Sequence, residues 1–406
     1  MSTDGLGRTG RRAAFAFWVS FLGLTATGCG GTKDRAAPEA PAPAPIRAVD
    51  YYVSPKGDDD DAGSRKRPWK TLGHAAARVA PGSTVHVARG RYAGPLVVRA
   101  DGRPDGRIRF VSSKRWGARI AASSSESLGV VSIPGDYVDF QGFDVSGRGG
   151  DGTAGIIVGG SHDRVIGNDV HDVAVTCPGG PNGGGGIIAG GGTPNYRNHD
   201  IQVVGNLVHD VVGTPRRACP GVQGIYASVA NVRIANNVSY RNADGCITSW
   251  HAASRLTIVN NTVTDCPTGI TVGSGGPGAT AGGNRGTTVA NNIVSSCGRG
   301  IAETTDGEHR VGPGNRYLNN LIFRCGARGL LVGGVAPRGG RPLVAGTLTL
   351  DPKLRERATH YQPRAASPVI DAGVPTAAPS SDFAGVRRPQ GPQVDIGAFE
   401  WSRAAP

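Results

Sequence analysis

The chain repeats one short phrase, and this repetition limits the possible folds more than any other feature of the sequence. The phrase reads IVNNTVTDCPTGITVG at residues 258–273, and it returns as VANNIVSSCGRGIAET from Val289 and as YLNNLIFRCGARGLLVG from Tyr317. Each copy carries an asparagine pair, an apolar alternation, a cysteine and then a glycine followed by an apolar residue. Repeats at this scale are typical of stacked structural units.

Six asparagines and six apolar strand starts extend the repeat over a longer stretch. The spacings between successive asparagines are 38, 31, 24, 31 and 28 residues, so the landmarks stay fixed while the connections vary. Such variation is typical of a solenoid with loops inserted at its corners. The leucine ladder of leucine-rich repeats and the aromatic marks of propeller blades are missing, so we predict a right-handed parallel β-helix. The asparagines are Asn168, Asn206, Asn237, Asn261, Asn292 and Asn320; the strand starts are Ile187, Ile225, Ile247, Ile270, Ile301 and Leu330.

The composition agrees with an all-β fold. The chain has 65 Gly, a single Met and 6% aromatic residues. Glycine destabilises helices but suits a protein of short strands and many turns. A buried asparagine at a repeated turn can hydrogen-bond to its copies on neighbouring coils, which explains a polar residue at a structural position. The sequence therefore predicts an asparagine ladder.

The N-terminal residues predict export. Three arginines precede an apolar run from Ala13 to Leu24, which is too short to cross a membrane, and small residues before Cys29 resemble a bacterial lipobox. We expect a signal peptide over residues 1–28, lipidation of Cys29 and a Pro/Ala-rich tether over residues 29–49. The alternative is an ordinary secreted protein with an unmodified cysteine.

Six cysteines remain if Cys29 is lipidated, and an even number suits a disulfide framework in an oxidising compartment. Cys177 and Cys219 each begin a Cys-Pro-Gly within an insertion that precedes a strand start, so we expect them to pair. Stacked coils bring cysteines within bridging distance, although free core thiols are the alternative. The further expected pairs are Cys246 with Cys266 and Cys297 with Cys325.

Both ends of the expected folded region resemble a known family. Residues 51–92, beginning YYVSPKGDDDD, resemble the N-terminal segment of bacterial secreted β-helix proteins related to the pectate-lyase superfamily, including family 9 polysaccharide lyases. Residues 351–401, with the phrases SPVIDAG and VDIGAFE, resemble the C-terminal segment of the same proteins. The resemblance implies a β-helix with an N-terminal cap over residues 50–350, a C-terminal segment packed on it over residues 351–406, and calcium as the one candidate cofactor.

The same resemblance implies a lysine base and a calcium-holding aspartate cluster, and the sequence supplies neither. No Lys occurs between Val130 and Leu350, and the nearest match to the cluster, residues 242–246, keeps only Asp244. A tight turn explains Asp244 better than a calcium site does. The run Asp58–Asp61 reads as a solvated loop, because no further ligand spacing supports calcium there. The motifs of polygalacturonases and alginate epimerases are also absent, so no inherited active site is predicted.

Loop insertions on both sides of the Gly-Ile strand predict a groove along that face, which solenoids use for extended ligands. Alternation from Ile301 turns Glu303 inward, so that residue lies either at a bend or in a functional role. Stacked His-Asp steps in GNDVHDV and GNLVHDV, namely His171 with Asp172 and His209 with Asp210, are expected to form a hydrogen-bond ladder rather than a metal site. The candidate catalytic residues are His251, Tyr226 and Glu303; the candidate substrate-binding residues are Trp250 for stacking, Asp306, and the carboxylate clamps Arg299 and Arg328.

The net charge of +13 at pH 7 favours acidic partners, which for a secreted β-helix are uronate polysaccharides. We expect a secreted, lipid-anchored monomer that binds acidic polysaccharide and cleaves it by β-elimination. The alternatives are a non-catalytic envelope or glycan-binding protein and a glycoside hydrolase that uses Glu303 and Asp306. Membrane contact is expected only through the anchor, and no motif for nucleic-acid binding is present.

Overall fold

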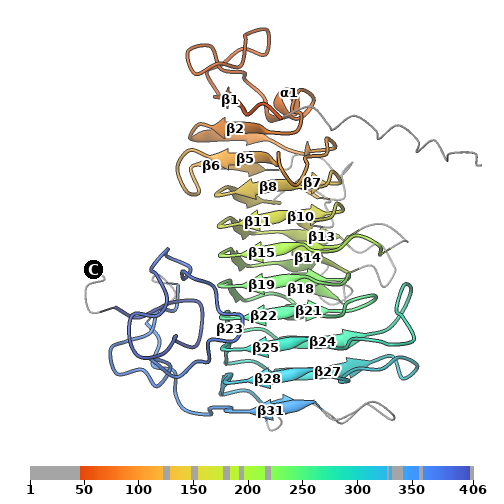
Figure 1. The fold of residues 1–406 in the computed structure, drawn as a ribbon, viewed down its shortest axis with the longest axis vertical. Coiled ribbons are helices and arrows are strands. Elements are labelled where there is room, and N and C mark those ends of the chain that lie inside the picture. The colour runs from red at the N-terminus through yellow and green to blue at the C-terminus, as the bar shows by residue number, and fades with distance from the viewer. Residues whose placement is uncertain are drawn as a thin grey trace, which may run out of the picture. The chain divides into compact units, whose positions relative to one another are not determined.

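A computed structural model shows a right-handed parallel β-helix, so the predicted fold is confirmed (Figure 1). Each coil from β2 to β30 gives one strand to each of three long parallel sheets, which we name A, B and C in the order in which the chain visits them; β1 and β31 extend sheet A at its two ends. Among the described residues the single helix is α1 (Leu72–Ala76), capped by Thr71, and no helix there is long and apolar enough to cross a membrane. The structure describes residues 46–121, 129–147, 154–176, 183–191, 196–214, 221–326, 329–331, 342–355 and 360–402.

The strands stack in chain order within each sheet. Sheet A contains β1 (Val49–Val53), β2 (Ser83–Val87), β5 (Ile108–Ser112), β8 (Val138–Gln141), β11 (Arg164–Ile166), β15 (Gln202–Val204), β19 (Arg233–Ala235), β22 (Thr257–Val259), β25 (Thr288–Ala290), β28 (Arg316–Leu318) and β31 (Leu343–Ala345). Sheet B contains β3 (Gly90–Ala93), β6 (Ala118–Ala121), β9 (Asp144–Ser146), β12 (Asp169–His171), β16 (Leu207–His209), β20 (Val238–Tyr240), β23 (Thr262–Thr264), β26 (Ile293–Ser295) and β29 (Leu321–Phe323). Sheet C contains β4 (Leu96–Val97), β7 (Val131–Ile133), β10 (Ala154–Val158), β14 (Gly184–Ala189), β18 (Val222–Ala227), β21 (Gly245–Ser249), β24 (Thr268–Ser274), β27 (Arg299–Thr305) and β30 (Leu330–Leu331). A small extra sheet pairs β13 (Ala174–Thr176) with β17 (Val212–Thr214).

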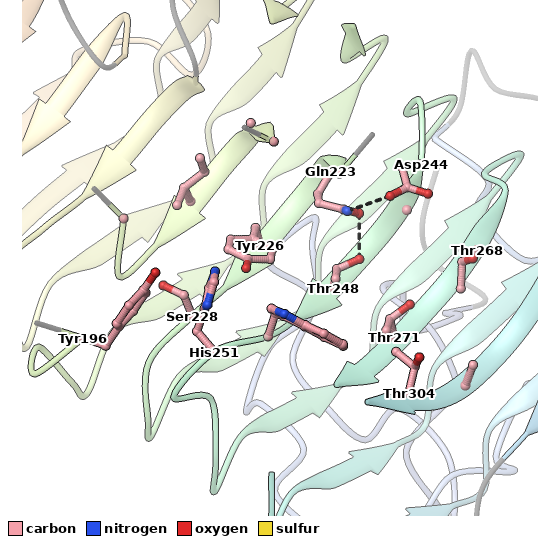
Figure 2. A pocket seen from close by; sticks show the side chains of 18 of the residues that line it. Tyr196, Gln223, Tyr226, Ser228, Asp244, Thr248, His251, Thr268, Thr271 and Thr304 are labelled. Atoms are coloured by element: carbon pink, nitrogen blue, oxygen red, sulfur yellow. Dashed lines mark hydrogen bonds between the residues drawn. The ribbon is translucent and has the colours of Figure 1, made fainter. Parts of the chain in front are cut away.

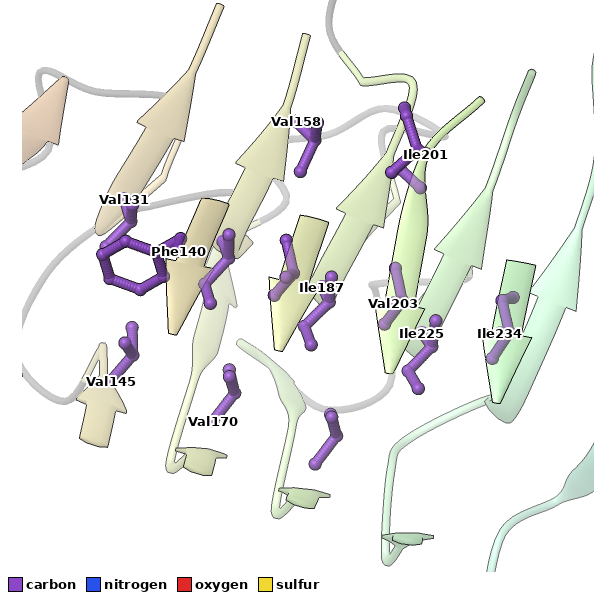
Figure 3. Packing of buried hydrophobic residues seen from close by; sticks show 14 of the residues in the cluster. Val131, Phe140, Val145, Val158, Val170, Ile187, Ile201, Val203, Ile225 and Ile234 are labelled. Atoms are coloured by element: carbon purple, nitrogen blue, oxygen red, sulfur yellow. The ribbon is translucent and has the colours of Figure 1, made fainter. Parts of the chain in front are cut away.

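The predicted register of the repeat is correct. In sheet C, Ile187 pairs with Ile225, Ile225 with Ile247, Ile247 with Ile270, Ile270 with Ile301, and Ile301 with Leu330. Side chains alternate along a strand, so these isoleucines all face the interior, where aliphatic residues of successive coils lie above one another (Figure 3). The residue after each isoleucine faces outward along one surface of sheet C, whereas the position before it, which is Cys246 or a glycine, also faces the interior.

The predicted asparagine ladder runs through the interior at the corner between sheets A and B. The Oδ1 atom of Asn237 accepts from the backbone N–H of Asn206 at 2.9 Å and from its Nδ2 at 3.0 Å, and the Nδ2 of Asn237 donates to the Val203 carbonyl at 2.8 Å. The same pattern links Asn237 to Asn261 and Asn261 to Asn292. Each buried amide thus satisfies backbone groups of the coil before it, which removes the cost of burying a polar side chain.

The residue before each ladder asparagine turns the chain and takes a left-handed backbone conformation. It is glycine in two coils, Gly167 and Gly205, at φ 62° and 67°, and in the next four it is an asparagine. Glycine and asparagine are the residues that tolerate this conformation. The four turn asparagines, Asn236, Asn260, Asn291 and Asn319, are at φ 54°, 54°, 55° and 47°.

The four turn asparagines also hold the C-terminal segment. Each Nδ2 donates to a backbone carbonyl of that segment: Asn236 to Ser381, Asn260 to Asp395, Asn291 to Val374 and Asn319 to Ala372. The Oδ1 of Asn291 also accepts from the Val374 N–H at 2.9 Å. Beside this line, Phe383 and Phe399 pack on Leu207 and Val238 of sheet B. The Asn-Asn pairs in the sequence therefore mark turns that hydrogen-bond to the C-terminal segment, whereas the Gly-Asn turns make no such bond among the described residues.

Replacing Asn291 by Gly should separate these two roles. Asn291→Gly keeps a residue suited to the left-handed turn but leaves the Val374 N–H and carbonyl without their partner, so the free energy of unfolding should fall by about 2 kcal/mol. Urea unfolding measures the loss, and limited proteolysis should cut the C-terminal segment earlier. The matched control is Gly205→Asn, which should change stability by less than about 0.5 kcal/mol because its turn lies outside these contacts. Equal effects of the two variants would contradict this division.

The cysteines follow the predicted stacking only in part. Cys246 and Cys266 form a disulfide with a Cα separation of 5.7 Å, as expected. Cys297 and Cys325 are free thiols on the following coils, so their predicted bond is wrong; Cys325 instead donates to the Phe323 carbonyl, and its thiol hydrogen-bonds with that of Cys297. Stacked cysteines also serve as small core residues, and this alternative applies here. Cys29, Cys177 and Cys219 lie outside the described residues.

Asp163 is a carboxyl buried without a cation bonded to it. Its Oδ1 accepts from the Val138 N–H at 2.7 Å, while its Oδ2 finds no hydrogen-bond partner among the described residues. Burial, with a smaller contribution from the negative charges of Asp136 and Asp139, raises its pKa to about 8. Five coils further on, Asn315 makes the equivalent bond to the Thr287 N–H with a neutral amide. Asp163 therefore keeps its proton near neutral pH in the folded chain.

Asp163→Asn should stabilise the protein in a pH-dependent way. The unfolded carboxyl releases its proton near its ordinary pKa of 3.8, whereas the folded one keeps it up to about pH 8, so the parent loses stability as pH rises between these values. The asparagine variant lacks this loss. Its advantage in the free energy of unfolding should grow by about 2–4 kcal/mol between pH 4 and pH 8, measured by urea unfolding. An advantage that does not change with pH would show that Asp163 ionises normally.

Candidate functional site

A groove of about 860 Å³ runs along the outer face of sheet C, on the surface where the sequence predicts it. It crosses the coils of β14, β18, β21, β24 and β27, and loops after the strands form one of its walls. Four of the predicted residues line it, namely Tyr226, Trp250, His251 and Arg299. Its outward row along the strands reads Tyr226, Thr248, Thr271 and Ala302 on successive coils.

A polar network lies on the floor of the groove. Thr248 donates its hydroxyl to the Gln223 Oε1 at 2.7 Å, and the Gln223 Nε2 donates to Asp244 at 3.0 Å (Figure 2). These two bonds fix the orientation of the Gln223 amide. Asp244 is the only carboxylate among the described lining residues, and Arg299 is the only cation, so the described lining carries no net charge.

His251 lies at one end of the groove between two tyrosines. Tyr196 stacks on its ring with a centroid distance of 4.7 Å, and Tyr226 meets it edge-on at 6.2 Å; Figure 2 shows the three side chains grouped on one side of the site. The Nδ1 of His251 lies 2.8 Å from the Pro277 carbonyl. Because a carbonyl can only accept, Nδ1 carries the proton and Nε2 has a free lone pair.

The surroundings keep His251 neutral. Burial lowers the pKa of the imidazole below its ordinary 6.5, and the bond to Pro277 opposes that shift without reversing it. The same burial raises the pKa of Tyr226 far above its ordinary 10. The Tyr226 hydroxyl has no hydrogen-bond partner among the described residues. The site thus holds an unprotonated imidazole beside a protonated phenol, which are the two states that general base and general acid catalysis require.

Two glycines make room for the aromatic rings. A Cβ at Gly273 would overlap the indole of Trp250, and a Cβ at Gly278, whose φ is 81°, would overlap the ring of Tyr196. The loop between them is held by Asp306, which accepts from the Gly276 N–H at 2.9 Å and also binds the His309 side chain. The predicted substrate-binding residue Asp306 therefore contacts the loop that carries Pro277 and does not line the groove.

Glu303 lies inside the coil, as strand alternation indicates. It is 5% exposed, and its Oε1 accepts from the Tyr317 hydroxyl at 2.7 Å and from the Asn315 Nδ2 at 3.2 Å. Its position in the sheet pairs with Val272, another interior residue. The structure does not bring Glu303 to the groove with the other candidate catalytic residues.

The predicted carboxylate clamps are separated from His251 or not described. Arg299 of β27 pairs with Thr268 of β24, which pairs with Gly245 at the start of β21. Arg299 therefore lies two coils from β21, level with the start of that strand, whereas His251 follows the end of β21. At about 3.3 Å per residue along a strand this separation is on the order of 20 Å. Arg299 can therefore contact a sugar some distance from His251 but not the sugar on which His251 acts. Arg328 lies outside the described residues.

The residues at the position of the family's calcium cluster do not fit calcium. Asn242 faces the interior, where its Oδ1 accepts from the Val211 N–H at 3.2 Å and its Nδ2 donates to the Ser239 hydroxyl at 2.9 Å. Cys246 is in a disulfide, so only Asp244 remains as a ligand. Calcium takes six to eight oxygen ligands, and one carboxylate does not hold it. In the Asp58–Asp61 loop, Asp59 accepts from the Lys70 and Thr71 N–H groups and from the hydroxyl of Thr71, the residue that caps α1.

The stacked His-Asp steps form a hydrogen-bond ladder on sheet B. The rings of His171 and His209 stack with centroids 5.3 Å apart, and each Nδ1 binds the aspartate that follows it in the chain. The Nε2 of His171 contacts Asp144 at 3.1 Å, and this bond, more than the opposing burial, raises its pKa to about 9. These bonds use both nitrogens of His171, so the structure favours the predicted ladder over a metal site.

Two other clusters have the composition of a metal site. His162, His199 and Asp200 converge at a corner of the coils, and Asp306, Glu308 and His309 converge in the loop after β27. In the first, the His199–Asp200 bond of 2.8 Å repeats the local His-Asp contact of the sheet B ladder. In the second, Asp306 already accepts from three backbone N–H groups. None of these six residues belongs to the described lining of the groove.

Three lining residues, Tyr196, Gln223 and Pro277, are not among the site residues that the sequence predicts. Tyr196 lies in one of the loop insertions after the Gly-Ile strand that were expected to wall the groove, so its loop was predicted but its ring was not. Gln223 precedes the inward-facing Ile225 by two positions, so alternation places it inside the coil, whereas the structure places it in the groove lining. Pro277 acts through its backbone carbonyl, for which the sequence carries no signal.

Comparisons with known proteins support the fold. No protein-family model matches the chain. A 59-residue stretch is 42% identical to YwoF, an uncharacterized protein of Bacillus subtilis (strain 168), but it covers 14% of this chain and only 13% of YwoF. The structure of pectate lyase Pel9A is similar over 88% of this chain and 98% of that one, with a TM-score of 0.53 and 16% identity. A rhamnogalacturonan lyase is similar over 78% and 95%, with a TM-score of 0.50 and 13% identity. The chain shares the β-helix fold of these lyases.

The state of His251 can be measured directly. In nitrogen-15 NMR spectra its imidazole should titrate below pH 6.5, and at neutral pH it should show the Nδ1–H tautomer, because burial disfavours the cation and Pro277 fixes the proton. His86→Gln, on the outer face of sheet A, is the control and should leave this resonance unchanged. A pKa above 6.5, or an Nε2–H tautomer, would show that His251 is not the free base described here.

Proposed function

We propose that the groove on sheet C binds an extended polysaccharide and that His251 cleaves it by β-elimination. The observation that carries this proposal is the neutral imidazole of His251, whose Nδ1 is bonded to Pro277. Within the described part of the chain, neither its Nε2 nor the nearby Tyr226 hydroxyl has a hydrogen-bond partner. The two lyases that share the fold support a carbohydrate ligand by analogy only.

The reaction moves one proton in each direction. The Nε2 of His251 removes the proton next to the carboxyl group of a uronate unit, a double bond forms within that sugar, and the bond to the leaving glycosidic oxygen breaks. The Tyr226 hydroxyl gives its proton to that oxygen. Tyr226 suits this role because its raised pKa keeps the phenol protonated until the leaving group needs the proton.

Binding along the groove relies on stacking and hydrogen bonds more than on charge. Trp250 and Tyr196 offer aromatic faces to sugar rings, while Thr248, Thr271 and the Gln223 amide offer hydroxyl and amide partners. Arg299 can hold the carboxylate of a more distant unit. The described lining has no net charge, so acidic polymers and their methyl esters are both reasonable substrates.

The same geometry argues against a glycoside hydrolase. Hydrolases of this kind place two carboxyl groups about 5–10 Å apart across the scissile bond. Among the described lining residues Asp244 is the only carboxylate, Glu303 lies inside the coil and Asp306 is bonded within its loop. A non-catalytic glycan-binding protein remains the second candidate, because the stacking surface does not depend on His251.

An elimination assay tests the proposal. Incubation with pectate, methyl-esterified pectate, alginate or glycosaminoglycans should generate the ultraviolet absorbance of an unsaturated uronate on at least one of them. His251→Ala should lower kcat by about 10²–10⁴-fold while affinity electrophoresis still shows binding, and Tyr226→Phe should lower kcat with little change in KM. Trp250→Ala should raise KM, and His86→Gln is the matched control. Reducing ends without absorbance would indicate hydrolysis, and retardation without products would indicate a binding protein.

A further inference from the structure

Sheet A carries a basic pocket on its outer face, separate from the groove. The pocket encloses about 270 Å³ and is lined by Arg107, Arg109 and Arg164, by Asp105, and by Ile46 and Ala48. The strands β5, β8 and β11 that form its floor follow one another in the upper part of the coil stack (Figure 1). No part of the proposed function uses this surface.

The floor of the pocket is a buried ion pair. Arg107 is 8% exposed and Asp139 is 5% exposed. The Nε of Arg107 donates to the Asp139 Oδ1 at 2.7 Å, and its Nη2 donates to the His162 carbonyl at 2.6 Å. The guanidinium also lies over the ring of Tyr137. These contacts hold Arg107 in place and already balance the charge of Asp139.

Two further arginines lie on either side of Asp139. The sheet register places Arg109 on the coil before Asp139 and Arg164 on the coil after it. Each has its Nε 3.5 Å from an Asp139 oxygen, which is long beside the 2.7–2.9 Å of a charge-assisted hydrogen bond. Neither makes another hydrogen bond or ion pair within the part of the chain that the structure describes. Their side chains are 50% and 39% exposed, so their terminal Nη groups can meet a ligand.

The pocket therefore holds more positive charge than its structure requires. Three guanidinium groups converge on one carboxylate, and the remaining acid, Asp105, is paired with Arg103 at 3.4 Å. A single Arg–Asp pair would stabilise the sheet, whereas additional like charges on neighbouring rungs oppose it. Coils stack at about 4.8 Å, so Arg109 and Arg164 leave the sheet roughly 10 Å apart, with Asp139 between them. One oxyanion between their Nη groups would offset both charges.

We propose that Arg109 and Arg164, held above the Arg107–Asp139 pair, form a binding site for a phosphate group. Two guanidinium forks present several N–H donors from different directions, which suits a tetrahedral oxyanion with two negative charges. The excess of two positive charges in the pocket matches that ligand. The apolar rim formed by Ile46 and Ala48 belongs to the segment expected to tether the chain to a membrane, so the phosphate can come from a lipid headgroup; free phosphate is the other source.

Calorimetric titration with inorganic phosphate tests the site. The full chain carrying Cys29→Ala excludes any lipid anchor, and sodium chloride keeps the ionic strength constant. Phosphate should bind more tightly than acetate, and Arg109→Ala with Arg164→Ala should weaken it on the order of a hundredfold, about tenfold for each lost arginine. Arg316→Ala, on the same outward row of sheet A, is the matched control and should bind as the parent does.

Sedimentation with vesicles distinguishes the two sources. Binding to phosphatidylcholine mixed with phosphatidic acid, whose phosphomonoester can carry two negative charges, but not to phosphatidylcholine alone, together with its loss in the double variant, would identify a lipid headgroup. Phosphate binding without vesicle binding would identify free phosphate. If the double variant fails to fold, the single variant Arg164→Gln replaces it. Phosphate should then raise the Tm of the parent more than it raises the Tm of Arg164→Gln. Equal phosphate binding by the double variant and the Arg316→Ala control, or no phosphate binding by the parent, would overturn the proposal.

Discussion

The structure depends on the hydrogen bonds that buried asparagines make between coils. Each ladder amide accepts from one backbone N–H of the preceding coil and donates to one of its carbonyls, so a coil can add to the stack only in one register. A shift by one residue would leave the amide buried without partners and turn the isoleucines of sheet C outward. Loops can then vary in length at other corners without disturbing the stack. The outward rows that form the groove and the basic pocket are consequences of this fixed register.

Much of the fold could be predicted because its repeated residues include buried asparagines, and an asparagine is costly to bury unless its amide is hydrogen-bonded. The asparagines and the Gly-Ile starts gave the fold, the register and the face that carries the groove, and the Cys246–Cys266 bond followed from stacking. The sequence could not separate Cys297 and Cys325, because stacked thiols and a disulfide need nearly the same backbone. The sequence pattern also could not distinguish the roles of the two residues in each Asn-Asn pair. The structure shows that its second asparagine builds the ladder, while the first turns the chain and binds the C-terminal segment.

The candidate site was harder to predict, because its chemistry comes from loops and backbone atoms. The sequence predicted Trp250 and His251 as site residues. It could not predict the tautomer and burial of His251, which depend on the Pro277 carbonyl and on stacking with Tyr196. Both belong to insertions whose course the repeat does not define. Glu303 shows the opposite case: strand alternation placed it correctly inside, where Tyr317 and Asn315 explain it structurally. Periodicity therefore locates residues on strands, whereas it says little about the walls of the groove.

The distribution of charge changes what the basic composition means. The net charge of +13 indicated an acidic ligand, and the natural place for it was the groove. The described lining of the groove has one cation and one carboxylate, while sheet A gathers Arg107, Arg109 and Arg164 around Asp139. No residue of a sheet B strand is in the described lining of either site, and Phe383 and Phe399 pack on its strands β16 and β20. The acidic partner that the composition indicates is thus better matched by sheet A than by sheet C. Because the two surfaces lie on different sheets of one coil stack, the phosphate site and the glycan groove that we propose would not compete for the same residues.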